Sequence, residues 1–319
     1  MKILIAYDGS SCSEAALDDL QSAGLPAAVD VLVMSVAEVW LPPPPINESI
    51  HDYAVELQTH PQFFKAYESG AKVVTEAETY ANHAKTRLRR SFPKWKVEAE
   101  ATYGSPAWEI LSRAIDFKPD LIIVGSHGHS AFNRLLLGSI SQKILTEANC
   151  SVRVARGRIE VDPFAVRVII GFDGLQGAKK AIEAVAMRHW RKGSEFRLIS
   201  VTDPITPSTI GRFIPPVTNL VDEINQSECS WIEKLAEPCL QNLRDLGFEA
   251  TLQIHSGNPK QVIIEESEKW NADAIFVGAN RFGSRLERFI LGSVSAAVAA
   301  RAHCSVEIVR KLTTSIEKE

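Results

Sequence analysis

The chain has 319 residues, of which 45% are hydrophobic and 23% charged, with a formal net charge of −4 at pH 7. This length exceeds the usual range of about 100 to 200 residues for one domain, so we expect two domains, each with its own core. An acidic chain lacks the basic field that holds a nucleic-acid backbone, which excludes nucleic acid as an expected partner.

Near-continuous apolar runs at residues 2–7, 29–39 and 121–124 predict central parallel strands that are covered on both faces. Residues 95–102 and 248–255 alternate between apolar and polar side chains, which is typical of edge strands. The S-x-x-E spacing of residues 11–14 predicts a capping box at the start of the first helix, and residues 61–92 predict a long helix. The resulting β-α-β-α-β-α-β-α-β order predicts a doubly wound, Rossmann-like parallel sheet of five strands.

Compartment is indicated by two features of the sequence. The first apolar run is too short for a signal peptide, and no apolar stretch approaches the roughly 18 to 20 residues of a membrane helix. The five cysteines, an odd number without a CxxC pair, indicate neither a disulfide framework nor a zinc site. We therefore expect a cytoplasmic protein without a membrane anchor.

The second half of the chain repeats the first. AYDG at residues 6–9 recurs as GFDG at residues 171–174, an offset of 165 (173 − 8), and CSV at residues 150–152 recurs at residues 304–306, an offset of 154 (304 − 150). Such a tandem repeat predicts two copies of one α/β fold. We expect domains at residues 1–157 and 164–311, joined by a short linker at residues 157–163.

Three segments of the first repeat meet at the carboxyl ends of its strands, where ligands of doubly wound sheets bind. They follow the first, second and fourth strands, and the last reads GSHG at residues 125–128, then nine residues, then GSIS at residues 138–141. Glycine allows the close approach of backbone N–H groups to phosphate, and Ser139 is expected to cap a helix whose N-terminus favours anions.

This G-x-x-G-x9-G-S pattern resembles the phosphate loop of the universal stress protein family, and the resemblance extends over both repeats. It implies an adenine nucleotide alpha-hydrolase-like fold that binds an adenine nucleotide such as ATP. ADP and AMP-type ligands stay open, as does Mg²⁺, and no metal ligand is assigned. By position, the residues implied to contact the nucleoside are Ala6, Asp8 and Val36. Those implied to surround ribose and phosphates are Gly125, Ser126, His127, Gly128, Gly138, Ser139, Ile140 and Ser141.

The second repeat retains part of this pattern. Its matching positions are Asp173, Val201, Gly278, Gly292, Ser293 and Ser295. Leu175 replaces Ser10, Arg281 stands at a glycine position, one residue is added before Gly292, and Ala296 replaces Gln142. Whether the second repeat binds nucleotide stays open.

The resemblance implies a nucleotide-dependent regulator or interaction protein in stress response, with an unidentified protein partner. Two alternatives remain: a slow enzyme that hydrolyses ATP or transfers an adenylyl group, and an interaction module that binds no nucleotide. No catalytic residue is assigned, because the sequence lacks the G-x-x-x-x-G-K-[ST] loop.

The resemblance also implies how the repeats associate. Single-domain members of the family pair through their last strands, so two fused copies would form an intramolecular pseudo-dimer about a pseudo-twofold axis. We expect residues 151–156 and 305–310 at that junction. A homodimer of the whole chain stays open.

Overall fold

A computed structural model describes residues 1–40, 61–127, 137–156, 165–204, 215–279 and 291–310. The expected linker at residues 157–163 lies outside the described residues, as do Gly128 and Arg281.

The first repeat has the predicted alternation of strands and helices. Its elements are β1 (Lys2–Ala6), α1 (Ser11–Asp19), β2 (Asp30–Ala37), α3 (Pro61–Ser91), β3 (Lys96–Tyr103), α4 (Pro106–Phe117), β4 (Leu121–Gly125), α5 (Ser139–Glu147) and β5 (Ser151–Ala155). The second repeat follows the same order. Its elements are β6 (Arg167–Gly171), α6 (Gln176–Ala186), β7 (Glu195–Thr202), α8 (Pro215–Asp245), β8 (Glu249–Ser256), α9 (Pro259–Lys269), β9 (Ala274–Gly278), α10 (Ser293–Arg301) and β10 (Ser305–Val309).

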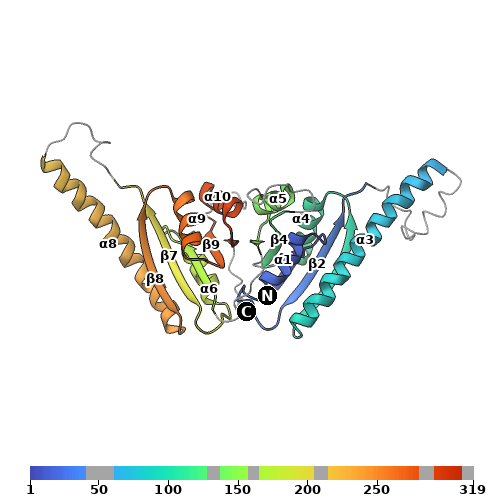
Figure 1. Ribbon diagram of the computed structural model, residues 1–319, viewed down its shortest axis with the longest axis horizontal. Coiled ribbons are helices and arrows are strands. Elements are labelled where there is room, and N and C mark those ends of the chain that lie inside the picture. The colour runs from blue at the N-terminus through green and yellow to red at the C-terminus, as the bar shows by residue number, and fades with distance from the viewer. Residues whose placement is uncertain (41–60, 128–136, 157–164, 205–214, 280–290, 311–319) are drawn as a thin grey trace, which may run out of the picture.

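All described strands lie in one ten-stranded sheet with the order β3-β2-β1-β4-β5-β10-β9-β6-β7-β8. Neighbouring strands within each repeat are parallel, whereas β5 and β10 pair antiparallel and join the repeats. The predictions of a doubly wound sheet, of β3 and β8 as its edges and of a junction through the last strands are confirmed. Figure 1 shows the two repeats side by side, with α3 and α8 on the outer flanks and α5 and α10 nearest the middle.

Helices cover both faces of this sheet. On one face α4, α5, α9 and α10 share a single apolar cluster that crosses the junction and includes Ile144, Val152, Val298 and Val306. On the other face α1 and α3 pack on the first repeat and α6 and α8 on the second, in two separate clusters. The long apolar strands are therefore buried on both sides, as their composition predicted.

The capping box predicted at Ser11 and the cap predicted at Ser139 are both wrong by one residue. The N-cap of α1 is Ser10, whose hydroxyl accepts from the Ser13 N–H at 3.3 Å, and α5 begins after Gly138 with no side-chain cap. Ser139 is thus the first residue of α5, not its cap. Ser10 and Gly138, the residues that precede the two helices, have the extended backbone of an N-cap.

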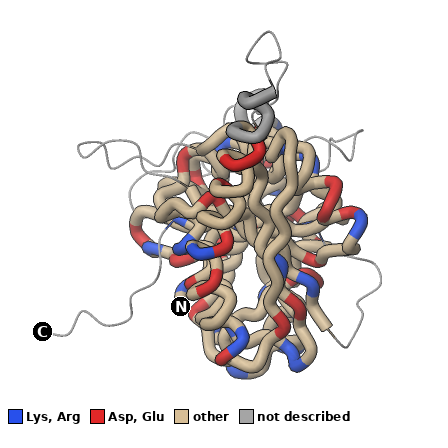
Figure 2. The backbone as a smooth tube through the Cα atoms, turned by 90° about the vertical axis from the view of Figure 1, so that its left-hand side faces the viewer, with Lys and Arg blue, Asp and Glu red and all other residues tan. Residues whose placement is uncertain are grey.

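The described helices are all too short or too polar to span a bilayer. Viewed from the side of the second repeat, acidic and basic residues are interspersed over the backbone of the described residues (Figure 2).

Candidate functional site

A cavity of about 480 Å³ opens at the carboxyl ends of β1, β2 and β4. Because β1 lies between β2 and β4, this is the point where the strand order reverses, the usual ligand site of doubly wound sheets. Of the residues assigned to nucleotide binding in the first repeat, those that line the cavity are Ala6, Asp8, Val36, Gly125, His127, Gly138, Ser139, Ile140 and Ser141. The structure therefore brings together three segments that are far apart in the sequence.

The loop after β1 is held in place by backbone contacts. The Ser35 hydroxyl donates to the Tyr7 carbonyl at 2.6 Å, and Asp8 Oδ1 accepts from the Ser10 N–H at 3.0 Å. Gly9 has φ +76°, and a Cβ there would lie 2.8 Å from the Tyr80 ring. The Asp-Gly pair thus combines a turn that orients the carboxylate with a position that only glycine fills easily.

Beside this loop, Glu14 of α1 joins Tyr7 to Arg87 of α3. Its hydroxyl donates to Glu14, and the same carboxylate binds Arg87, which also pairs with Asp18. Burial raises the pKa of Tyr7 above its ordinary value, outweighing the opposite effect of the Arg87 charge. Glu14 is therefore occupied by α3 and does not close a capping box.

The N-terminus of α5 forms the other end of the cavity. The first intrahelical bond runs from the Gln142 N–H to the Gly138 carbonyl, so the amides of Ser139, Ile140 and Ser141 precede it and point out of the helix end. The Ser141 hydroxyl donates to the Gly125 carbonyl at 2.7 Å and fixes this helix to β4. Free N–H groups and the positive end of the helix dipole suit an anion here.

His127 carries the clearest unmet polar group at the cavity. Its Nε2 is buried and has no hydrogen-bond partner in the described part of the chain, while Nδ1 lies 3.1 Å from Ser126 Oγ. Burial, with a smaller contribution from the Arg156 charge, lowers the pKa of His127 below its ordinary value. The neutral ring can therefore present Nε2 to a ligand.

Two assigned residues, Ser126 and Gly125, also make packing or polar contacts outside the cavity. Ser126 is not among the residues that line the cavity, and its hydroxyl lies near Cys12 Sγ and His127 Nδ1. Gly125 has no left-handed backbone, and a Cβ there would lie 3.0 Å from the backbone of Cys12. Gly125 is thus required for the packing of α1 on β4.

The walls of the cavity that come from helices and from the residue after β2 were not predicted from the sequence. These additional residues are Ser13, Glu38, Val73, Glu76, Ala77, Tyr80, Pro106 and Ile110. The four in α3 recur at i, i+3, i+4 and i+7, the spacing of one helix face, and this spacing was visible in the predicted helix. Which face meets the cavity could not be read from spacing alone.

The second repeat places Asp173, Val201, Gly278, Gly292, Ser293 and Ser295 at the corresponding strand and helix ends. Asp173 Oδ1 accepts from the Leu175 N–H at 2.9 Å, as Asp8 does from Ser10. The strand-to-helix contact is tighter, because a Cβ at Gly278 would lie 2.0 Å from the backbone of Gly177. The Ser295 hydroxyl is 3.5 Å from the Gly278 carbonyl, longer than its counterpart in the first repeat. The closer contact at Gly278 and the longer distance from Ser295 to the Gly278 carbonyl could not be read from the sequence motif.

Comparison with known proteins identifies the family. The model of the universal stress protein family matches residues 1–156 and 166–310. A universal stress protein of Mycobacterium tuberculosis is 23% identical over 317 residues, covering 97% of each chain. One from Thermus aquaticus is 33% identical over 154 residues, covering 48% of this chain and 97% of the relative.

Solved structures agree on the fold. The crystal structure of a universal stress protein from Archaeoglobus fulgidus matches with a TM-score of 0.59 at 22% identity, covering 97% of this chain and 98% of the other. With a family match in each repeat and the Rossmann-like sheet described above, this chain belongs to the universal stress protein family.

Proposed function

We propose that the first repeat binds an adenine nucleotide, with ATP as the expected ligand, and that occupancy regulates how the protein interacts with an unidentified partner in stress response. The observation that carries the proposal is the cavity with the α5 N-terminus and the orphan His127 Nε2 at one end. A cavity of about 480 Å³ is within the size range of small-molecule sites. The two repeats are proposed as domains at residues 1–157 and 164–311, and the cytoplasm as their compartment.

The shape of the cavity favours one orientation of the nucleotide. Apolar groups from Val73, Ala77, Pro106 and Ile110 line the side toward β2, where a flat base could be enclosed. The phosphates would then lie at the α5 N-terminus, and the sugar near Asp8 between them. The Asp8 carboxylate accepts hydrogen bonds, so ribose hydroxyls are suitable donors to it.

The charge of the lining supports Mg²⁺ as a companion of ATP. Asp8, Glu38 and Glu76 line the cavity, and none of the described lining residues is Lys or Arg. No cluster of three metal-binding side chains occurs among the described residues. Mg²⁺ would therefore be held mainly by phosphate oxygens and would offset the like charge of the carboxylates.

Isothermal titration calorimetry of nucleotide-free, full-length protein tests the proposal. ATP with Mg²⁺ is expected to bind, and Asp8→Asn is expected to weaken binding about tenfold or more, the effect of losing a hydrogen bond to a charged group. Asparagine retains the Oδ1 that accepts from Ser10, so the turn is preserved. Asp173→Asn makes the same change in the second repeat and is the matched control.

The outcomes separate the alternatives. Binding of one nucleotide that Asp8→Asn weakens and Asp173→Asn does not would assign it to the first repeat. Binding of two, with each variant affecting one, would extend the proposal to the second repeat. No binding of ATP, ADP or AMP would refute it and favour a nucleotide-free interaction module.

A further inference from the structure

The antiparallel pairing of β5 with β10 sets one residue of each strand on the pseudo-twofold axis. Arg153 lies opposite Glu307, with Val154 opposite Val306 and Val152 opposite Ile308. Arg153 and Glu307 are also equivalent positions of the repeat, because 307 − 153 = 154 is the offset of this region. Pairing two first repeats in the same register would therefore set arginine opposite arginine, and two second repeats would set glutamate opposite glutamate.

This axis pair is buried, so water does not screen its charges. Arg153 is 0% and Glu307 is 2% exposed, and Arg153 Nη1 lies 3.5 Å from Glu307 Oε2. Each residue is supported within its own repeat: Arg153 Nε donates to Asp19 Oδ2 at 2.6 Å, and Glu307 pairs with Arg188. Burial opposes the charge of Arg153, but the carboxylates of Asp19 and Glu307 raise its pKa above the ordinary value. Two like charges at this place would keep the partners within their own repeats but would lose the opposite charge across the axis and face each other without water.

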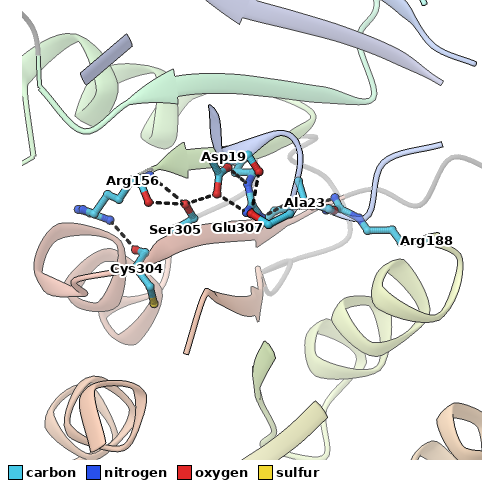
Figure 3. Close-up of polar contacts among 9 residues, drawn as sticks. Asp19, Ala23, Arg156, Arg188, Cys304, Ser305 and Glu307 are labelled. Carbon is cyan, nitrogen blue, oxygen red and sulfur yellow. Dashed lines mark hydrogen bonds and ion pairs between the residues drawn. The ribbon is translucent and has the colours of Figure 1, made fainter. Parts of the chain in front are cut away.

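Two further contacts across the junction use charged residues that are each present in only one repeat, Asp19 in the first and Arg188 in the second. The Ser305 hydroxyl donates to Asp19 Oδ1 at 2.6 Å, and Arg188 Nη1 donates to the Ala23 carbonyl at 2.6 Å (Figure 3). The equivalent of Asp19 in the second repeat is Ala184, and the equivalent of Arg188 in the first is Ala23. Two identical repeats could not form both contacts.

The backbone register itself does not discriminate between partners. The Arg156 N–H donates to Ser305 Oγ at 2.9 Å, and the equivalent Arg310 N–H donates to Ser151 Oγ at 3.2 Å. Since these bonds are related by the pseudo-twofold axis, any two repeats could form them. The charged residues near the axis are therefore what distinguishes one pairing from another.

We propose that the Arg153–Glu307 pair makes this junction heterotypic: the β5 edge accepts the last strand of a second repeat and rejects a second copy of itself. The charges therefore select the other kind of repeat as the partner of each last strand, and in this chain β5 and β10 supply that partner to each other. Dimers that pair β5 with β5 or β10 with β10 are excluded.

Charge reversal in full-length protein tests this assignment. One chain carries Arg153→Glu with Asp19→Asn, and the other carries Glu307→Arg with Arg188→Gln, so that neither reversed residue meets a like charge within its own repeat. In each chain alone, the residues at positions 153 and 307 carry charges of the same sign and face each other across the pseudo-twofold axis. We expect each to melt about 6 °C or more below wild type, as for a broken buried ion pair.

The two reversed chains are complementary to each other. When they are refolded together, the carboxylate introduced at position 153 of one chain meets the guanidinium introduced at position 307 of the other. We therefore expect a heterodimer with twice the 35.1 kDa mass of one chain, measured by native mass spectrometry. The same experiment with Arg113→Glu and Glu100→Arg, a half-buried pair within the first repeat, is the control and is expected to give monomers. No heterodimer from the complementary mixture, or a homodimer of either reversed chain, would overturn the proposal.

Substitution by uncharged residues tests the proposal if a charge-reversed chain does not fold. Arg153→Met, Glu307→Gln and the double variant form a double-mutant cycle in urea unfolding. We expect the axis pair to be coupled at least tenfold in the unfolding equilibrium constant, against less than twofold for Arg113 with Glu100. Equal coupling of the two pairs would refute a discriminating role for the axis pair.

Discussion

Gly125 and Gly278 end the fourth strand of their repeats, yet the same substitution should have different consequences. A Cβ at Gly278 would lie 2.0 Å from the carbonyl carbon of Gly177, whereas a Cβ at Gly125 would lie 3.0 Å from that of Cys12. Carbon atoms rest about 3.5 to 4.0 Å apart. Gly278→Ala therefore requires α6 to withdraw from β9 by about 1.5 Å or more, and Gly125→Ala requires a shift of α1 of about 0.5 to 1 Å.

These displacements set the expected loss of stability. Neither glycine has a left-handed backbone, so steric contact alone decides the cost. The neighbour of Gly278 is backbone within α6, whose buried Gly177, Ala178 and Ala181 pack closely on the sheet. Overpacking costs about 1 to 3 kcal/mol and more where backbone must move, so we expect about 1 kcal/mol for Gly125→Ala and about 3 kcal/mol or more for Gly278→Ala.

Thermal unfolding followed by circular dichroism measures both variants. The expected fall in Tm is about 2 to 4 °C for Gly125→Ala and about 6 °C or more for Gly278→Ala. Equal shifts, or a larger shift for Gly125→Ala, would refute the argument from these contacts.

Three further predictions concern single side chains. Leu175 is the N-cap of α6 and makes no side-chain capping bond, so Leu175→Ser should raise the free energy of unfolding measured in urea. Ser10→Ala removes the capping bond of α1 and should lower it by about 1 kcal/mol. A loss of stability in Leu175→Ser would contradict this prediction. Burial, and to a lesser extent the Arg156 charge, lowers the pKa of His127 in the folded protein, so the unfolded chain binds that proton first as the pH falls. The stability of the protein should therefore decrease as the pH drops below about 6.5 toward the folded-state pKa. In thermal melts over a pH series, His127→Gln should show a smaller decrease. Burial raises the pKa of the Cys150 thiol to about 12, so iodoacetamide at pH 8 should leave it unmodified in native protein, as peptide mass spectrometry would show.

Much of the cavity was predictable because its residues follow strands. Asp8, Val36 and Gly125 end or follow apolar runs, and the carboxyl ends of parallel strands must share one edge of the sheet. The helix walls were not predictable in the same way. Glu76 and Tyr80 lie on a helix that the sequence predicted correctly, but the side that faces the cavity depends on how α3 packs on β2 and β3.

The sequence by itself determined the order of strands and helices, the two repeats, the edge strands and the position of the ligand end of the sheet. Those features depend on periodicity and residue types within short segments, or on a direct match between segments. Tertiary structure alone decided the role of Arg153, a charge in an otherwise apolar strand. Its partners Asp19 and Glu307 are 134 and 154 positions away, and only the antiparallel pairing of β5 with β10 brings one charge of each sign to the same buried point. Its stabilising or repulsive effect is therefore set by what the other strand presents across the axis, which local sequence does not encode.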